Sequence, residues 1–166
     1  MRSERAGWTD GKRNATGVAA GRAEKESDMD DFAQEGWVRH EADTFAGRLG
    51  MVLERPRDGG IEMALRSDDT HRNLGGILHG GVIMTMFDRT MGINCRNAVP
   101  GARFVMASMN VNFLRQVAIG DFLVMTCRLR KTGRRAIFAD AEARVGEALV
   151  ATASGVVMQV APAAAT

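Results

Sequence analysis

A short stretch, NLGGILHGGVIMTMFD, holds the residue types best suited to chemistry in this 166-residue chain. A glycine pair, Gly80 and Gly81, precedes an apolar run that ends at the carboxylate of Asp88. A helix beginning at the glycines would leave backbone N–H groups free at the positive end of its dipole. That arrangement suits a carbonyl oxygen that gains negative charge during a reaction, because glycine lets a ligand approach the backbone. The simpler alternative is that the glycines only permit a tight turn into the helix.

The carboxylate of Asp88 also has two interpretations. It lies beside Arg89 and on the same helical face as Met84 and Met91. Apolar surroundings raise the pKa of a carboxyl group, which suits a general base or a nucleophile. The alternative is a solvated face, or an ion pair with Arg89 or Arg96.

Helix geometry constrains any joint action of the two groups. Gly80 and Asp88 are eight residues apart, or roughly 12 Å along a helix axis. A reacting carbonyl must lie about 3 Å from both its nucleophile and its oxyanion donor. If both residues act, Gly80 of one subunit therefore faces Asp88 of another.

The hydrophobic pattern around this stretch predicts an α+β domain. Residues 50–66 read as a hairpin with its turn at RPRDGG, and residues 81–97 as one long buried helix. Four strands are expected between residues 103 and 160, and their short connections suggest that they are antiparallel neighbours. One or two short helices are expected within residues 31–49. A curved antiparallel sheet wrapped around the long helix would satisfy this order, with a second subunit covering the rest of the helix.

The first of the four late strands shows a period-two pattern, which places alternate residues on one face of the sheet. The apolar positions in this alternation are Val105, Ala107, Met109, Val111 and Phe113.

Composition excludes several classes of function. The formal net charge of +2 and the 5% aromatic content argue against a nucleic-acid partner. No apolar run is long enough to cross a membrane, and the two cysteines without a secretory signal favour the cytoplasm. The three histidines lack metal-ligand spacing, so neither a metal nor another cofactor is expected. Residues 1–28 read as a flexible extension, residues 29–160 as the single domain and residues 161–166 as a tail.

The spacing N-x-x-G-x-x-H-G-G, followed by an aspartate nine residues after the histidine, resembles the hotdog-fold acyl-CoA thioesterases of the phenylacetyl-CoA thioesterase-like group. The residues that carry the resemblance are Asn73, Gly76, His79, Gly80, Gly81 and Asp88. It extends from about Leu49 to Val160 and includes the segments MNVNFLR and KTGRR.

The resemblance implies a hotdog fold, hydrolysis of an acyl- or aryl-CoA thioester, and a homodimer that often doubles to a tetramer. Asp88 would be the nucleophile or general base, and the Gly80 N–H would polarise the thioester carbonyl. Asn73 would position water or the carboxylate, and His79 would shape the loop and bond the substrate. Gly81 would belong to the substrate-binding part of the same turn.

Two further regions are expected to contact substrate. Some relatives carry a hydroxyl residue on the third strand, where this chain has Met106, with Ser108 two residues on. The turn at Gly133, Arg134 and Arg135 would bind coenzyme A phosphates, although such a basic strand edge is also typical of a solvated surface.

Two other functions remain open at this point. A non-catalytic acyl-CoA-binding hotdog module is one, although residues 1–28 do not resemble the DNA-binding helix pair that usually accompanies it. A hotdog dehydratase is the other, and the Asp/His spacing that it requires is not found.

Overall fold

The computed structural model describes residues 32–40, 45–57 and 59–160. The chain divides into two units, residues 1–35 and residues 36–166. In the first unit, residues 32–34 form a helical turn. The predicted extension (residues 1–28) and the predicted tail (residues 161–166) lie outside the described residues, so both stay predictions.

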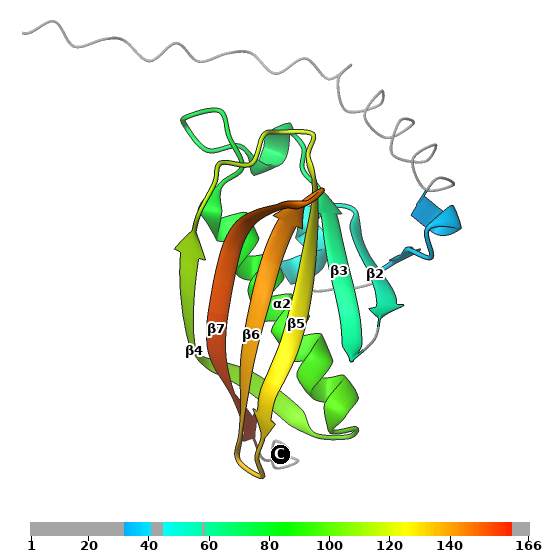
Figure 1. Ribbon diagram of the computed structural model, residues 1–166, viewed down its shortest axis with the longest axis vertical. Helices are drawn as coiled ribbons and strands as arrows, with labels where there is room; N and C mark the ends of the chain where they lie inside the picture. Colours follow the sequence, from blue (N-terminus) through cyan, green and yellow to red (C-terminus); the bar gives the residue numbers. More distant parts are fainter. Residues whose placement is uncertain (1–31, 41–44, 58, 161–166) are drawn as a thin grey trace, which may run out of the picture. The chain divides into compact units, whose positions relative to one another are not determined.

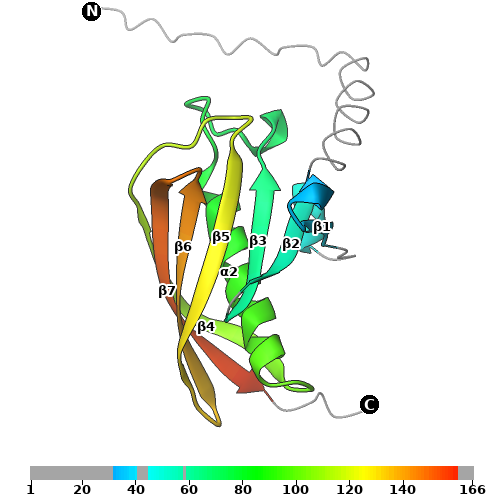
Figure 2. The same ribbon diagram turned by 45° about the vertical axis from the view of Figure 1, so that its right-hand side comes forward.

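The described part of the second unit is an antiparallel sheet of seven strands with one long helix against it (Figures 1 and 2). The strands are β1 (Val38–Arg39), β2 (Val52–Arg57), β3 (Gly60–Arg66), β4 (Arg103–Phe113), β5 (Phe122–Thr132), β6 (Ala136–Val145) and β7 (Ala148–Val160). The helices are η1 (Phe45–Leu49) and η2 (Asp69–His71), both 3₁₀, and α2 (Gly80–Ala98). The predicted hotdog fold, a curved sheet around one central helix, is confirmed. No helix in the described ranges has both the length and the apolar composition that crossing a membrane requires.

The order of the strands differs from the expected one. It runs β1-β2-β3-β5-β6-β7-β4, so β4 pairs with β7 and not with β5. The prediction that the last four strands are all sequential neighbours is therefore wrong for the first of them. Residues 114–121, between β4 and β5, are long enough to cross the ends of β7 and β6 (Figure 1). The shorter β5–β6 and β6–β7 connections do join neighbours.

A β-bulge interrupts the alternation predicted for β4. Met106 pairs with Val157 and Ser108 with the adjacent Val156, so Ala107 is the additional residue in the strand. Four β4 residues pack against the core, two on each side of the bulge: Phe104, Met106, Met109 and Val111. The single apolar face predicted for this strand is thus wrong at Val105, which is 50% exposed.

Helix α2 extends one residue beyond the predicted range at each end and buries one face against the sheet. The side chains of Met86, Phe87, Met91 and Cys95 are fully buried there. Asn94 joins the helix to the β2–β3 hairpin, because its amide accepts from the Ile61 N–H (2.8 Å) and donates to the Ile61 carbonyl (2.9 Å). These contacts hold α2 at a defined height along the sheet.

The hairpin predicted for residues 50–66 is confirmed. Arg57 pairs with Gly60, and Gly59 in the turn has a φ of 86°, a left-handed conformation that glycine adopts without strain. The short strand β1 was not predicted, since only helices were expected between residues 31 and 49. Two residues are too few to show a strand period.

Candidate active site

The N-terminus of α2 is capped by the residue that precedes the glycine pair. The Nδ1 atom of His79 accepts a hydrogen bond from the Gly81 N–H at 2.9 Å. This bond requires the neutral ring to carry its proton on Nε2, which leaves that N–H as a donor. The Val82 N–H donates to the His79 carbonyl at 2.9 Å. Within the described residues, the N–H of Gly80 has no hydrogen-bond acceptor.

A phenylalanine ring covers Gly80 from β4. A Cβ atom added to Gly80 would lie 3.1 Å from the Phe113 ring, closer than ordinary packing allows. Phe113 is nevertheless 52% exposed, so it is not enclosed by the core. The sequence pattern placed Phe113 only in a strand, because nothing in it predicts a contact across 33 residues.

The loop that leads into α2 is held by its own polar side chains. The Oδ1 atom of Asn73 accepts from the N–H groups of Gly75 (2.8 Å) and Ile77 (3.3 Å). The buried His71 ring accepts from the Asp68 N–H at 2.9 Å through Nδ1 and donates from Nε2 to the Leu49 carbonyl at 2.9 Å. The side-chain oxygen of Asn73 therefore stabilises this turn. The sequence predicts a different role for the same side chain, the positioning of water or of the carboxylate.

Asp88 lies two turns farther along α2, beside a pocket of about 310 Å³. It is exposed and has no hydrogen bond or ion pair within the described residues. Partial burial raises the pKa of the Asp88 carboxyl, and the positive charges of Arg89 and Arg96 oppose that rise. The raised pKa agrees with the direction expected from the sequence, although Met91, expected on the same helical face, is fully buried while Asp88 is exposed.

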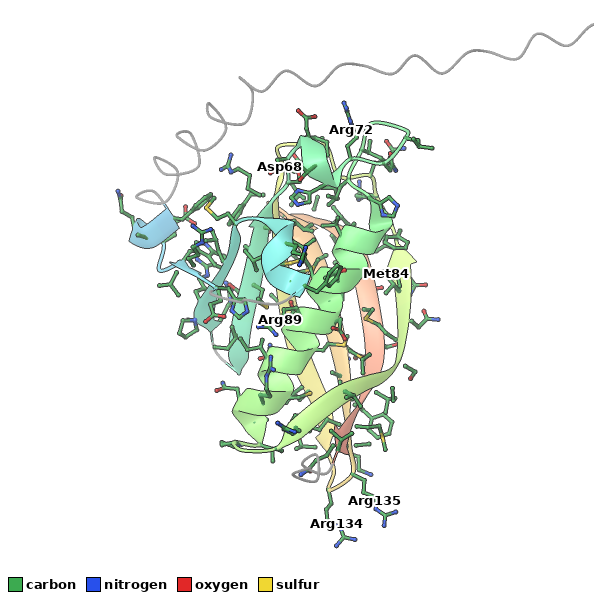
Figure 3. The ribbon with its side chains drawn as sticks, turned by 180° about the vertical axis from the view of Figure 1, so that it is seen from behind. Asp68, Arg72, Met84, Arg89, Arg134 and Arg135 are labelled. Atoms are coloured by element: carbon green, nitrogen blue, oxygen red, sulfur yellow. The ribbon has the colours of Figure 1, made fainter. Side chains whose placement is uncertain are left out.

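Arg89 forms a hydrogen bond with His40 and does not pair with its neighbour Asp88. Its Nε donates to Nε2 of His40 at 3.0 Å, and Nδ1 of His40 contacts the carboxylate of Glu54. The guanidinium lies on the side of α2 toward β2 and β3 (Figure 3). The sequence offered no signal for this cluster, which joins three separate segments.

The two β4 residues considered for substrate contact lie in different places. Met106 lines the pocket beside Asp88. Ser108 lines a separate hollow of about 430 Å³ with residues of β6 and β7, including Phe138 and Ser154. The bulge at Ala107 is the reason, because it separates these two positions by a change of register. The structure therefore does not bring Ser108 to Asp88.

The basic turn between β5 and β6 lies far from the start of α2. Arg134 and Arg135 project from the opposite end of the sheet from Asp68 and Arg72, which mark the loop before α2 (Figure 3). Gly133 allows the tight turn, since a Cβ there would lie 2.8 Å from the Ala136 carbonyl oxygen. One chain alone does not bring this turn to Gly80.

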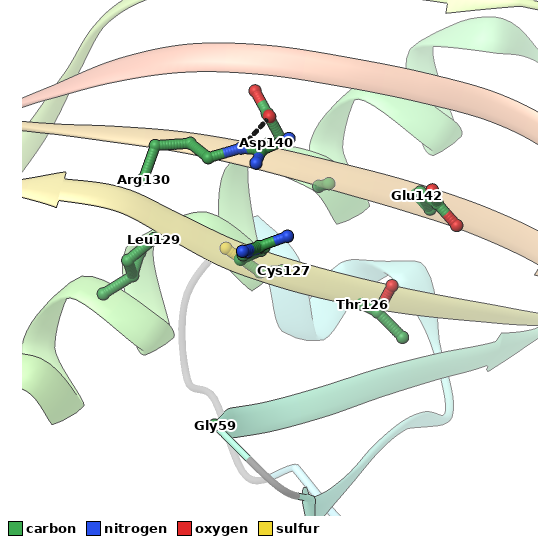
Figure 4. Close-up of a pocket in the computed structure, with 9 residues that line it drawn as sticks. Gly59, Thr126, Cys127, Leu129, Arg130, Asp140 and Glu142 are labelled. Atoms are coloured by element: carbon green, nitrogen blue, oxygen red, sulfur yellow. Dashed lines mark hydrogen bonds and ion pairs between the residues drawn. The ribbon is translucent and has the colours of Figure 1, made fainter.

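A further hollow, of about 610 Å³, lies along β5 and β6 and includes Cys127 (Figure 4). An ion pair between Arg130 and Asp140 crosses it. Burial is the main reason that the pKa of the Cys127 thiol rises to about 12 and that of Cys95 to about 11. Thiols with such pKa values are poor nucleophiles at neutral pH, which leaves Asp88 as the better candidate.

Comparison with known proteins identifies the family of this chain. The model of the thioesterase superfamily matches residues 75–152. The Pseudomonas aeruginosa protein PA0474, named as a candidate esterase, is 38% identical over 97 residues, which are 58% of this chain and 72% of that protein. Human acyl-coenzyme A thioesterase 13 is 29% identical over 94 residues, covering 55% of this chain and 64% of that protein.

A solved structure shows the same fold over most of the chain. A phenylacetic acid degradation-related candidate thioesterase of Ralstonia eutropha superposes with a TM-score of 0.65 at 28% identity, over 72% of this chain and 92% of that one. Fold and relatives together define a thioester hydrolase. The chain belongs to the thioesterase superfamily, as its motif indicated.

Proposed function

We propose that the protein hydrolyses the thioester of an acyl- or aryl-coenzyme A in a site shared by two subunits. Coenzyme A as the thiol partner is suggested by the name of the human relative, acyl-coenzyme A thioesterase 13. Water supplies an oxygen to the acyl carbon, the C–S bond breaks, and the coenzyme leaves as a thiol. Asp88 either attacks the carbonyl or removes a proton from the attacking water.

The observation that carries this proposal is the unpaired N–H of Gly80 on the same continuous helix as Asp88. A backbone N–H at a helix N-terminus stabilises the oxyanion that forms when a thioester carbonyl is attacked. His79 and Asn73 support this role by satisfying the neighbouring N–H groups of Gly81, Gly75 and Ile77. Because those three N–H groups are already bonded, the Gly80 N–H is the donor that remains available to a substrate.

The separation along α2 is the reason to place the second group on a partner chain. Eight residues of unbroken helix hold Gly80 and Asp88 roughly 12 Å apart, too far for one carbonyl. A dimer that pairs two copies of α2 would bring Gly80 of one near Asp88 of the other. The outward face of α2 supports such pairing, because Met84 is 42% exposed on it. Among the described strands, β4 ends the sheet and leaves one edge unpaired, a second surface for association.

Mixed dimers test the shared site directly. Asp88→Asn removes the base, and Gly80→Val places a branched side chain against Phe113 and blocks the N–H. We expect each variant alone to lose on the order of a hundredfold or more in kcat, measured as free thiol released from acyl-CoA. A mixed dimer contains one site with both wild-type groups and should recover activity.

The experiment has a clear opposite result. If mixed dimers form, shown by two distinguishable tags on one particle, and no activity returns, the two groups do not act across the interface. Wild-type chains carrying the same tags control for tagging and mixing. Their activity should match that of the untagged protein.

We further propose that the basic turn at Gly133, Arg134 and Arg135 contacts the coenzyme phosphates. Both arginines are exposed, and no hydrogen bond or ion pair of their side chains occurs within the described residues. Phosphates lie far from the reacting carbonyl and bind equally in the ground and transition states. Replacing either arginine by alanine should therefore raise KM more than it lowers kcat, with a smaller effect at high salt. Unchanged KM in both variants would show that this turn is only a solvated edge.

A further inference from the structure

The pocket beside Asp88 is lined by charged residues of α2 and by apolar residues of the sheet. Besides Asp88, Arg89 and Arg96, its lining consists of Gly92 on α2, Phe104, Val105 and Met106 on β4, and Val157 on β7. Asp88 lies at one end of this stretch of helix. Arg96 lies two turns farther on, roughly 12 Å along the axis.

Arg96 is a cation without a partner in the described part of the chain. It is exposed and makes no hydrogen bond or ion pair there. Arg89 also borders the pocket, but its guanidinium is bonded to His40, with Glu54 behind it. Side chains on a helix generally lean toward its N-terminus, so an arginine at position 96 can extend toward Asp88.

Gly92 keeps the space between the two charged residues open. A Cβ added at this position would meet no atom within 4 Å, so the helix surface there borders empty space. Gly92 lies one turn from Asp88 and one turn from Arg96, on the same face of the helix. A chain of methylene groups could therefore lie over Gly92 between the two residues.

We propose that this pocket holds an acyl chain whose far end is a carboxylate paired with Arg96. This substrate class, the coenzyme A monothioesters of dicarboxylic acids, rests on the proposed thioester hydrolysis at Asp88. A guanidinium pairs with a carboxylate through charge-assisted and often bidentate hydrogen bonds, whereas a terminal methyl group offers it nothing. The helix rise of roughly 12 Å between Asp88 and Arg96, less about 3 Å for the contact at each end, leaves roughly 6 Å for the acyl chain, which fits an acid of about six carbons.

The test compares two non-hydrolysable thioether analogues that share the whole coenzyme. One carries a six-carbon chain ending in a carboxylate, and the other a six-carbon chain ending in a methyl group. For the full-length protein, calorimetry should give a dissociation constant about tenfold lower for the carboxylate analogue. Arg96→Gln should abolish this preference and leave the affinity for the methyl analogue unchanged.

A matched control removes one positive charge from a different arginine, outside the lining of the pocket. Arg103 begins β4, is exposed and does not line the pocket. The variant Arg103→Gln should keep the tenfold preference of the wild-type protein. Arg96→Lys, which keeps a positive charge but loses the bidentate geometry, should give an intermediate preference.

Two results would overturn the proposal. Equal affinities of the wild-type protein for the two analogues would show that the pocket does not distinguish a terminal carboxylate from a terminal methyl group. Equal weakening of both analogues in Arg96→Gln would assign Arg96 to the coenzyme phosphates. Thiol release from the corresponding thioesters is measured separately. Its absence would reject hydrolysis, while the binding preference would still decide the role of Arg96.

Discussion

The two faces of helix α2 have opposite surroundings. The face toward the sheet carries Met86, Phe87 and Met91, whose side chains are fully buried. The outward face carries Met84, Asp88 and Arg96, all of which are exposed. Phe87 and Asp88 are adjacent in the sequence, yet one is enclosed by the core and the other borders an open pocket.

This contrast separates what holds the fold together from what is available for chemistry. The buried face contributes packing and the removal of apolar surface from water. The outward face contributes little to the stability of the single chain, because Asp88 and Arg96 lack hydrogen bonds within the described residues. Charged and glycine positions that cost stability are expected where function requires them.

Phe87→Ala should give the largest effect on stability. Removing a fully buried phenylalanine loses its transfer free energy and leaves a cavity, which typically costs about 3–5 kcal/mol. Urea unfolding followed by circular dichroism would measure the change in the free energy of unfolding. A loss below about 1 kcal/mol would mean that the core closes around the gap or that α2 is not packed as described.

Asp88→Asn is the control on the opposite face, and we expect it not to destabilise the protein. The raised pKa of Asp88 means that folding favours its protonated form. The stabilisation from this preference is fully present below the carboxyl's unfolded pKa and is lost as pH rises through the folded one. Asparagine removes that pH dependence. If Asp88→Asn destabilised as much as Phe87→Ala at neutral pH, the carboxylate would be structural.

The elements with a strong hydrophobic period could be predicted from the sequence. The helix appeared because apolar residues recur through 81–97, and the hairpin because Asp-Gly-Gly lies between two apolar runs. The position of β4 at the edge of the sheet could not be derived, because a short loop does not reveal whether it joins neighbours or crosses strand ends. The bulge at Ala107 also escaped the pattern, because residues 104–107 are all apolar and hide the shift of one residue in the alternation.

The candidate site was predictable only where its parts are close in the sequence. The spacing from Asn73 to Asp88 marked the helix start and the carboxylate together. Contacts between distant segments, such as Phe113 over Gly80 and His40 on Arg89, depend on the fold and have no local signal. For the same reason, the sequence alone leaves an ion pair between Asp88 and Arg89 open, whereas in the structure Arg89 bonds to His40.

The smallest expected effect comes from two glycine-to-alanine changes on α2, which should have opposite signs. Alanine in a helix interior is more favourable than glycine by roughly 0.5–1 kcal/mol, because glycine loses more backbone entropy. At Gly92 the new methyl group meets no atom within 4 Å, so Gly92→Ala should gain that stability. At Gly81 the methyl group would lie 2.9 Å from Nδ1 of His79, the atom that caps the helix. Gly81→Ala should therefore lose about 1 kcal/mol through the damaged cap.

Urea unfolding of both variants beside the wild-type protein would measure the two shifts in the free energy of unfolding. A loss of stability in Gly92→Ala would show that the space beside Asp88 is filled in solution, by a partner subunit or by a rearranged β4. A gain of stability with slower thiol release would instead show that Gly92 is retained to keep the pocket open at the expense of a more stable helix.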